Sequence, residues 1–341
     1  MTEFNDRFLK ACRKEATDRP PVWFMRQAGR YQRKYRDIRR KHSLVEICKI
    51  PDVCAEVTLL PIRQFGFDAA IVFSDIMIPL EPMGIDFEYK PGVGPVINNP
   101  IEFKKDVERL KTIDFSKDLQ YTGKSLGILK NELNVPCIGF VGAPFTLASY
   151  MLEGGPSKSY IQLKSFMYQE TEAWHLLMDK LATNMADYLL FQVESGAMAV
   201  QIFDSWVGIL SQVDYREYVF PHMQKMVQYL KEETSVPVIL FGTNSSHLLQ
   251  DMKATGADVI GIDWKTDLAG AWKDMNYEVA VQGNLDPTLL FGEWDLIENR
   301  AKSLLDAIPN KPGFIFNLGH GILPKTPEEN VRKLVNLVQG K

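Results

Sequence analysis

Eight short apolar runs spread along the chain constrain its fold more than any other feature. They do not alternate with polar residues, and segments with helical periodicity separate them. Such runs are typical of parallel strands that helices cover on both faces. The runs are Pro21–Met25, Ala69–Phe73, Pro136–Val141, Met198–Phe203, Pro237–Phe241, Val259–Ile262, Val279–Val281 and Phe314–Phe316. Strands alternating with helices in this number predict an α/β fold, a single-domain (β/α)8 TIM barrel.

One segment breaks the alternation. "IDFEYKPGVGPVINNP", residues 85–100, predicts a β-hairpin insertion that turns at Pro91-Gly92 or at Gly94-Pro95. The alternative fold is a doubly wound open sheet, but no GxGxxG sequence follows the first run, where the residues are Met25-Arg-Gln-Ala-Gly-Arg. Although 341 residues are enough for two domains, no segment has the composition of a linker. We therefore predict one domain over residues 1–341.

The last helix carries the clearest helical signals. In "TPEENVRKLVNLV", Thr326 is predicted to be the N-cap, Pro327 the first helical residue, and Glu329 the second half of a capping box. The apolar residues that follow share one helical face, as an amphipathic helix requires. They are Val331, Leu334, Val335 and Val338.

Charge and cysteine content narrow the classes of function. The chain has 39 basic and 43 acidic residues, which argues against nucleic acid as the main partner. No signal peptide is expected, and no apolar run reaches the roughly 18 to 20 residues that span a bilayer. Four cysteines without a CxxC pair fit a reducing compartment. We therefore expect a cytoplasmic protein that does not enter membranes.

Polar residues gather where the predicted strands end, which in such a barrel is where active sites lie. Arg26 and Arg30 follow the first run and flank Ala28-Gly29, while Asp75 follows the second. Later ends supply three more candidates, namely Tyr150, Ser205 and His320. Each has an ordinary alternative: the arginines could be surface charges, Asp75 and Ser205 helix caps, and Tyr150 a core residue. His320 is the hardest to explain by packing, because it stands between two glycines.

The two arginines indicate the charge of the ligand. Arginine binds carboxylates through two parallel hydrogen bonds and stays protonated at physiological pH. The pattern therefore predicts a small anionic ligand, rich in carboxylates, with one feature that needs an anion opposite it. The basic residues from Arg33 to Lys41 are more typical of a solvated helix face than of a site.

Five segments resemble the uroporphyrinogen decarboxylase family. They are "PVWFMRQAGRY", "FSDI", "GAPFTLASYMLEGG", "QIFDSWVG" and "NLGHGILPKTPEENV", and the resemblance runs from about residue 4 to residue 338. It implies a (β/α)8 barrel, usually a homodimer, that converts uroporphyrinogen III to coproporphyrinogen III in haem biosynthesis. Four acetate side chains lose carbon dioxide, and the family uses neither a metal nor an organic cofactor.

The resemblance also implies roles for matching residues. Arg26 and Arg30 would bind substrate carboxylates, while Gln27 and Ala28 would contact the substrate through their backbone. Asp75 would lie under the macrocycle and accept hydrogen bonds from the pyrrole N–H groups.

Further matching residues would line the site. Phe73 and Phe203 would supply apolar walls, and Tyr150, Ser205 and His320 would meet the substrate's side chains. The proton donor stays open among Arg26, Tyr150, His320 and a bound water. One departure is Gln32-Arg33-Lys34, where the family often has an apolar residue, a proline and an acidic residue.

Three other functions remain to be weighed. A methyltransferase of the same superfamily would need zinc, held by an HxC pair and a later cysteine, but this chain has no HxC and no cysteine beyond Cys137. A non-catalytic tetrapyrrole or anion-binding protein would keep the arginines but would not need Asp75. Nucleic-acid binding by residues 26–41 would predict salt-sensitive retention on DNA.

Overall fold

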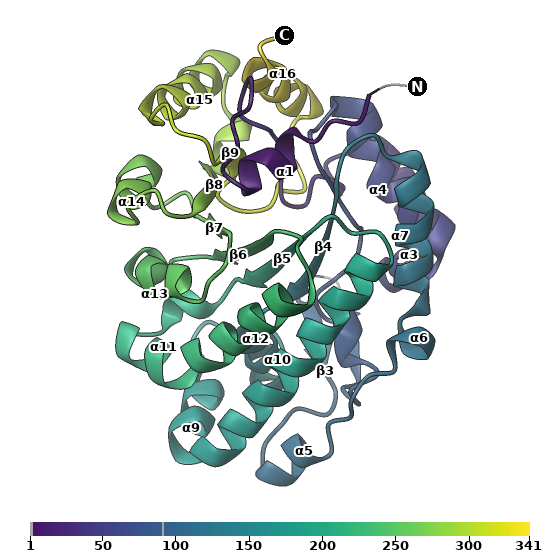
Figure 1. Cartoon of the computed structure of the whole chain (residues 1–341). Helices are drawn as coiled ribbons and strands as arrows, with labels where there is room; N and C mark the ends of the chain where they lie inside the picture. The colour runs from purple at the N-terminus through teal and green to yellow at the C-terminus, as the bar shows by residue number, and fades with distance from the viewer. Residues whose placement is uncertain (1–2, 91) are drawn as a thin grey trace.

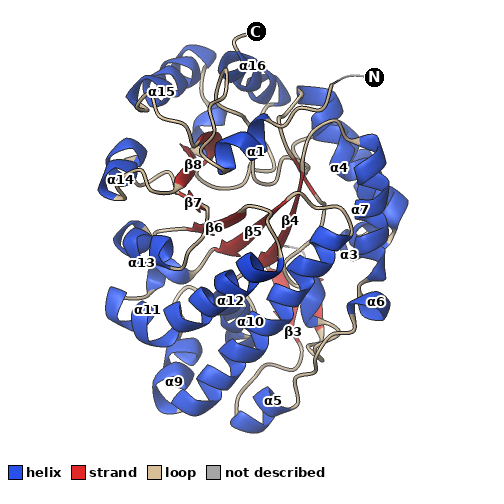
Figure 2. Ribbon diagram, in the orientation of Figure 1, coloured by secondary structure: helices blue, strands red, loops and turns tan. Residues whose placement is uncertain are grey.

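In the computed structural model, parallel strands curl around a common axis, and helices lie outside them (Figures 1 and 2). The structure describes residues 3–90 and 92–341. Within this part of the chain, seven parallel strands are hydrogen-bonded in the order β1-β4-β5-β6-β7-β8-β9. Their bounds are β1 Ala70–Ile71, β4 Cys137–Gly142, β5 Ala199–Asp204, β6 Val238–Gly242, β7 Val259–Gly261, β8 Ala280–Leu285 and β9 Phe314–Leu318. Each overlaps a predicted run, so the barrel prediction is confirmed.

The prediction that the first strand spans Pro21–Met25 is wrong in its length. Only Val22 forms a β-bridge, which is parallel and pairs with Phe316 of β9. The N–H groups of Phe24 and Met25 donate to the side chains of Gln27 and Asn317, at 3.2 Å each, so they are not available to a backbone ladder. The segment still occupies the eighth position of the barrel between β9 and β1.

Asp68 ties this segment to the start of β1. Its backbone N–H donates to the Val22 carbonyl at 2.9 Å, and its carboxylate accepts the Val22 N–H at 2.8 Å. Arg19 donates to both carboxylate oxygens at 2.7 and 2.8 Å, and Asn5 adds a bond at 2.8 Å. Inside the barrel, Trp23 Nε1 donates to buried Gln282 at 2.8 Å. The ring therefore closes through side chains as much as through backbone pairing.

Helices surround the strands and fill the connections between them (Figure 2). None of those described is long and apolar enough to cross a membrane. Their bounds are α1 Arg7–Cys12, α2 Arg33–Arg39, α3 Leu44–Lys49, α4 Pro51–Phe65, α5 Lys104–Glu108, α6 Phe115–Asp118, α7 Gln120–Glu132, α8 Pro144–Glu153, α9 Ile161–Gln169, α10 Thr171–Glu194, α11 Gln212–Tyr218, α12 Phe220–Glu233, α13 Leu249–Ala254, α14 Leu268–Asp274, α15 Trp294–Ala307 and α16 Glu328–Gln339.

Helix α16 buries the predicted apolar face but begins later than predicted. Val331, Leu334 and Val335 are fully buried. The predicted capping box at Thr326 and Glu329 is wrong, because the N-cap is Pro327 and no side chain caps the helix. Thr326 is buried instead, and its Oγ1 has no hydrogen-bond partner among the described residues.

The antiparallel pair β2 Phe87–Lys90 and β3 Gly94–Ile97 lies within the segment predicted to be a hairpin. Of the predicted turn residues, Pro91 lies outside the described residues and Gly92 has φ 77°. The pair docks on the end of α8, where the Ile97 N–H donates to the Gly154 carbonyl at 2.9 Å. A Cβ on Gly155 would lie 3.0 Å from the Pro95 carbonyl oxygen, so a glycine is needed for this contact.

Candidate active site

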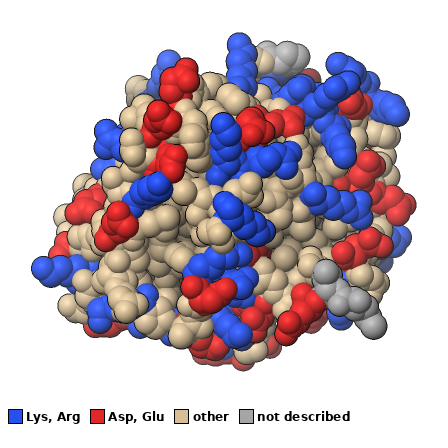
Figure 3. Space-filling view, turned by 90° about the horizontal axis from the view of Figure 1, so that it is seen from above, with Lys and Arg blue, Asp and Glu red and all other residues tan. Residues whose placement is uncertain are grey.

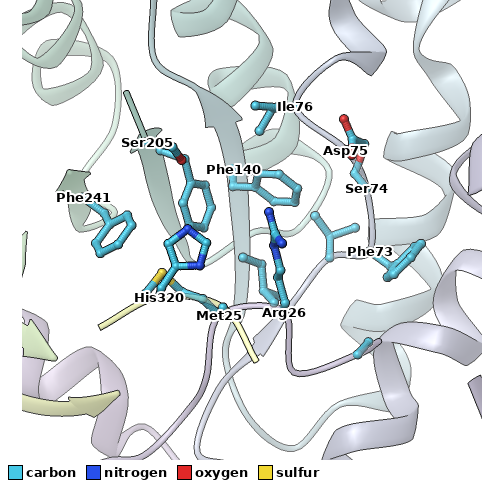
Figure 4. Close-up of a pocket in the computed structure, with 15 residues that line it drawn as sticks. Met25, Arg26, Phe73, Ser74, Asp75, Ile76, Phe140, Ser205, Phe241 and His320 are labelled. Atoms are coloured by element: carbon cyan, nitrogen blue, oxygen red, sulfur yellow. The ribbon is translucent and has the colours of Figure 1, made fainter. Parts of the chain in front are cut away.

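A cavity opens at the carboxyl ends of β1, β4, β5 and β6, which is the end of the barrel where the sequence predicts a site (Figure 4). Its walls come from the segments that follow these strands and from the loops after Val22 and β9. The lining residues are Met25, Arg26, Ala28, Ile71, Val72, Phe73, Ser74, Asp75, Ile76, Phe140, Phe203, Ser205, Phe241, His320 and Gly321.

Arg26 rises into this cavity beside His320 (Figure 4). Its backbone has φ 59°, an uncommon left-handed conformation for a residue with a side chain. Its stem passes across Gly321, where a Cβ would lie 2.5 Å from Arg26 Cδ and 2.6 Å from Cγ. The second glycine of "NLGHG" therefore makes room for the arginine.

The rest of the "RQAGR" loop has a different arrangement. Gln27 is buried, and its side chain accepts the Phe24 N–H and donates to the Ala69 carbonyl at 3.0 Å, so it holds the loop against β1. Ala28 lines the cavity, whereas Arg30 is exposed and is not among the lining residues.

The departure at Gln32-Arg33 also shapes this loop. Gln32 is fully buried, and its side-chain oxygen accepts the Gly29 N–H at 3.1 Å. The Arg33 backbone N–H donates to Glu328 at 2.6 Å, a bond that a proline at this position could not make. Helix α2, which begins at Arg33, then exposes most of its basic side chains to solvent.

Asp75 stands across the cavity from His320 (Figure 4). Its Oδ1 accepts the Met77 N–H at 3.0 Å, so part of its capacity is used by a local turn. The segment before it is anchored to α4, because Thr58 Oγ1 accepts the Phe73 N–H at 2.9 Å and Cys54 Sγ donates to the Phe73 carbonyl at 3.1 Å. The ring of Phe73 packs on Tyr35 with centroids 5.6 Å apart and points away from Arg26 (Figure 4).

Aromatic rings form the floor between these polar groups. Phe203 lies edge-to-face with Phe140 at 5.5 Å and with Phe241 at 6.0 Å. Strand pairing sets this cluster, because Phe203 of β5 is in register with Phe241 of β6. The result is an apolar surface bordered by charged and polar groups.

His320 is a neutral group in this setting. Burial and then the nearby Arg26 guanidinium lower its pKa from 6.5 to about 4. Its ring meets Phe241 and Trp264 edge-on, at 6.5 and 6.1 Å. Gly319 allows the Trp264 contact, because a Cβ there would lie 2.2 Å from the Trp264 backbone nitrogen.

Tyr150 and Ser205 approach from α8 and from the end of β5. Tyr150 is not among the lining residues, and it packs edge-on against Trp206 at 6.1 Å. Burial raises the pKa of Tyr150, and the Asp75 charge acts in the same direction. Ser205 lines the cavity. Burial raises the pKa of the preceding residue, Asp204, to about 7. A hydrogen bond from Thr146 to that carboxyl, at 2.8 Å, acts in the opposite direction.

Several lining residues were missed by the sequence analysis. They are Met25, Ile71, Val72, Ser74, Ile76, Phe140, Phe241 and Gly321. Phe140 and Phe241 lie near the carboxyl ends of predicted strands, so their position was an available signal. Within residues 3–90 and 92–341, no group of three or more His, Cys, Asp or Glu side chains is arranged to hold a metal ion.

A family model described as "Uroporphyrinogen decarboxylase (URO-D)" matches residues 3–340. The chain belongs to the uroporphyrinogen decarboxylase family. A uroporphyrinogen decarboxylase of Koribacter versatilis is 49% identical over 99% of this chain and 97% of its own length. Those of Chloroflexus aurantiacus and Staphylococcus epidermidis are each 50% identical, over 98% of this chain and 95% of theirs.

Solved structures share the fold of this uroporphyrinogen decarboxylase family member at much lower identity. A methyltransferase from Methanosarcina mazei is 21% identical, covers 98% of both chains and has a TM-score of 0.80. A putative vitamin-B12-independent methionine synthase from Listeria monocytogenes is 12% identical, covers 96% of this chain and 97% of its own, and has a TM-score of 0.57. At such identities the likeness concerns the fold alone.

Proposed function

We propose that this chain is a cofactor-independent carboxy-lyase that decarboxylates uroporphyrinogen III. It removes the carboxylates of the four acetate side chains as carbon dioxide and gives coproporphyrinogen III in porphyrin and haem biosynthesis. The observation that carries the proposal is that Asp75 and Arg26 both line one cavity, together with a cluster of aromatic rings. Family membership supports the choice of reaction.

The chemistry gives Asp75 its role. Loss of carbon dioxide leaves an electron pair that needs a sink, and a pyrrole ring becomes one when it is protonated at a ring carbon. That ring then carries positive charge, which an ionised Asp75 beside the pyrrole N–H groups stabilises as it forms. Such preorganised electrostatic stabilisation acts on the transition state more than on the bound substrate.

The cations bind the substrate's carboxylates. Arg26 in the cavity takes one of them, and exposed Arg30 takes another at the rim. The basic face of α2 helps to attract the polyanion from solution.

Further side chains contact the macrocycle and its substituents. Ala28 and Gln27 offer backbone groups, while Phe73 and Phe203 offer apolar contact. Tyr150, Ser205 and His320 offer polar contacts to the side chains. The side chain of Gln27 is already bonded within its loop, so Gln27 would contact the substrate through its backbone. The ring of Phe73 packs on Tyr35, so only part of that ring would contact the substrate.

The pKa shifts bear on the proton donor. His320, with its pKa lowered to about 4, is not protonated at neutral pH. Burial raises the pKa of Tyr150, so its hydroxyl releases a proton less readily than an exposed tyrosine. These two residues are therefore proposed as hydrogen-bond donors, and Arg26 and water remain the candidates for the acid.

We also propose that two copies pair in the cytoplasm and that nucleic acid is not a partner. Family resemblance supports the pairing, and four free, buried cysteines fit a reducing compartment. On the face that carries α15 and α16, basic and acidic side chains are interspersed (Figure 3). Light scattering should give twice the 38.8 kDa of one chain, and a mass of one chain would contradict the pairing.

Anaerobic incubation with uroporphyrinogen III tests the proposed reaction. After oxidation and chromatography, we expect porphyrins with seven, six, five and finally four carboxylates. Heat-denatured protein is the control. An unchanged octacarboxylate from folded protein would contradict the proposal.

A further inference from the structure

The hydroxyl of Tyr89 is an unexplained polar group beside the proposed site. Tyr89 belongs to β2 of the hairpin, and its ring packs edge-on against Phe87 at 5.8 Å. Its Oη is shielded from solvent, and no described residue gives it a hydrogen bond of acceptable geometry. Buried hydroxyls nearly always have a partner, so this one points to a hydrogen bond that is completed in another state of the site.

The groups around this hydroxyl identify the partner. Burial raises the pKa of Tyr89, and the Asp75 carboxylate raises it further, both through its charge and as a hydrogen-bond acceptor for the hydroxyl, although the contact in the free protein lacks good hydrogen-bond geometry. Cys48 of α3 and Tyr150 of α8 have a smaller influence on this pKa in the same direction. Burial raises the pKa of Cys48 far above its usual value, so the thiol stays protonated. Asp75 is therefore the strongest acceptor near the Tyr89 hydroxyl.

Asp75 has capacity for such a bond. A carboxylate offers about four acceptor positions. The Met77 N–H takes one at Oδ1, and no described residue donates to Oδ2. A bond from Tyr89 would leave two positions for the pyrrole N–H groups of a bound substrate.

We propose that Tyr89 is a positioning residue whose hydroxyl donates a hydrogen bond to Asp75 once substrate is bound, and thereby fixes the carboxylate beneath the macrocycle. This inference rests on the proposed function, in which Asp75 stabilises the protonated pyrrole. The hairpin brings the hydroxyl to this place, because β3 is bonded to the end of α8 through Ile97 and Gly154. The hairpin insertion thus holds the Tyr89 hydroxyl near the catalytic carboxylate.

Tyr89→Phe tests the proposal, because it removes the hydroxyl and keeps the ring on Phe87. We expect kcat to fall about tenfold, as for a lost hydrogen bond to a charged group, with KM almost unchanged. The acid limb of the kcat profile should move to higher pH, because a bond that favours the ionised carboxylate in the substrate complex is gone. The melting temperature should fall little, because in the free protein the hydroxyl makes no hydrogen bond of good geometry.

Tyr121→Phe is the matched control. Tyr121 of α7 is also half-buried, but no Asp75 charge stands beside it, so its loss should leave kcat and the acid limb unchanged. The second measurement is Asp75→Asn with and without Tyr89→Phe, in single turnovers. If Tyr89 acts through Asp75, adding Tyr89→Phe to Asp75→Asn should cause no further loss.

The outcomes separate this inference from the function on which it rests. An unchanged kcat and acid limb in Tyr89→Phe, with Asp75→Asn inactive, would overturn the inference and leave the function standing. Losses that multiply in the double variant would also overturn it, because Tyr89 would then act elsewhere. A fully active Asp75→Asn would overturn both the inference and the proposed role of Asp75.

Discussion

At His320, burial and the Arg26 guanidinium act on the imidazole in the same direction. Both disfavour the charged form and lower the pKa from 6.5 to about 4. The unfolded chain therefore takes up this proton first, and the folded state loses stability as pH falls from about 6.5 toward 4. Above that window the group is neutral in both states and the stability is fully present.

His320→Gln should therefore leave the shape of the pH–activity profile unchanged between about pH 6 and 9. A neutral imidazole supplies only a hydrogen bond, which a glutamine amide partly replaces, so kcat/KM should fall by no more than about tenfold. Steady-state kinetics across this range provide the measurement. Loss of an entire limb of the profile in the variant would show that the protonated imidazole takes part.

Individual site residues were predictable where they follow a strand, and less so where contacts come from elsewhere. Arg26, Asp75 and His320 lie on the cavity wall at the ends of predicted runs. Arg30 is exposed and lies outside the cavity lining, although it follows the same run. Tyr89 could not be found from the sequence, because the docking of the hairpin that carries it depends on contacts far along the chain.

At the scale of elements, the docking of the hairpin on α8 depends on the two glycines that end "MLEGG", Gly154 and Gly155. Gly155 has φ 157°, and a Cβ there would press on the Pro95 carbonyl oxygen at 3.0 Å. We expect Gly155→Ala to push β3 off α8 and to speed hydrogen exchange in Phe87–Lys90 and Gly94–Ile97 by about tenfold or more. Activity should fall with it, because Tyr89 moves with the hairpin.

Gly66→Ala is the control for backbone strain in that experiment. Gly66 ends α4 with φ 71°, but a Cβ there would meet nothing within 4 Å. Its replacement should cost about 1 kcal/mol of stability without loosening the hairpin. Equal exchange in the two variants would show that Gly155 is not what docks β3.

The elements also show why local patterns predict some features and miss others. Apolar runs mark the strands because burial on both faces leaves no room for alternation. The first run failed as a strand because nearby side chains, those of Gln27 and Asn317, bind its N–H groups. The capping signal at Thr326 failed because tertiary packing buries that residue before the helix begins.

For the molecule as a whole, closure of the barrel depends on Asp68. Burial alone would raise its pKa, but hydrogen bonds from Arg19 and the Val22 N–H lower it below its ordinary value. The ionised carboxylate therefore stabilises the fold above about pH 4, and this contribution is lost as pH falls below the pKa of the unfolded chain.

Asp68→Asn should destabilise the protein by roughly 3–5 kcal/mol at neutral pH, because it leaves Arg19 without its buried partner. Denaturant unfolding at pH 7 provides the measurement. Asp18→Asn is a matched control, because Asp18 pairs with Arg7 at the surface and should change stability by under about 1 kcal/mol. Similar losses in both variants would contradict the role of Asp68 in closure.

The most direct test of the proposed catalysis is carbon dioxide release by Asp75→Asn. Asparagine keeps the size and the contact with the Met77 N–H but removes the charge that stabilises the protonated pyrrole. We predict a rate about 100- to 1000-fold below that of the unaltered protein, with macrocycle binding retained. Unchanged release of carbon dioxide would contradict the account.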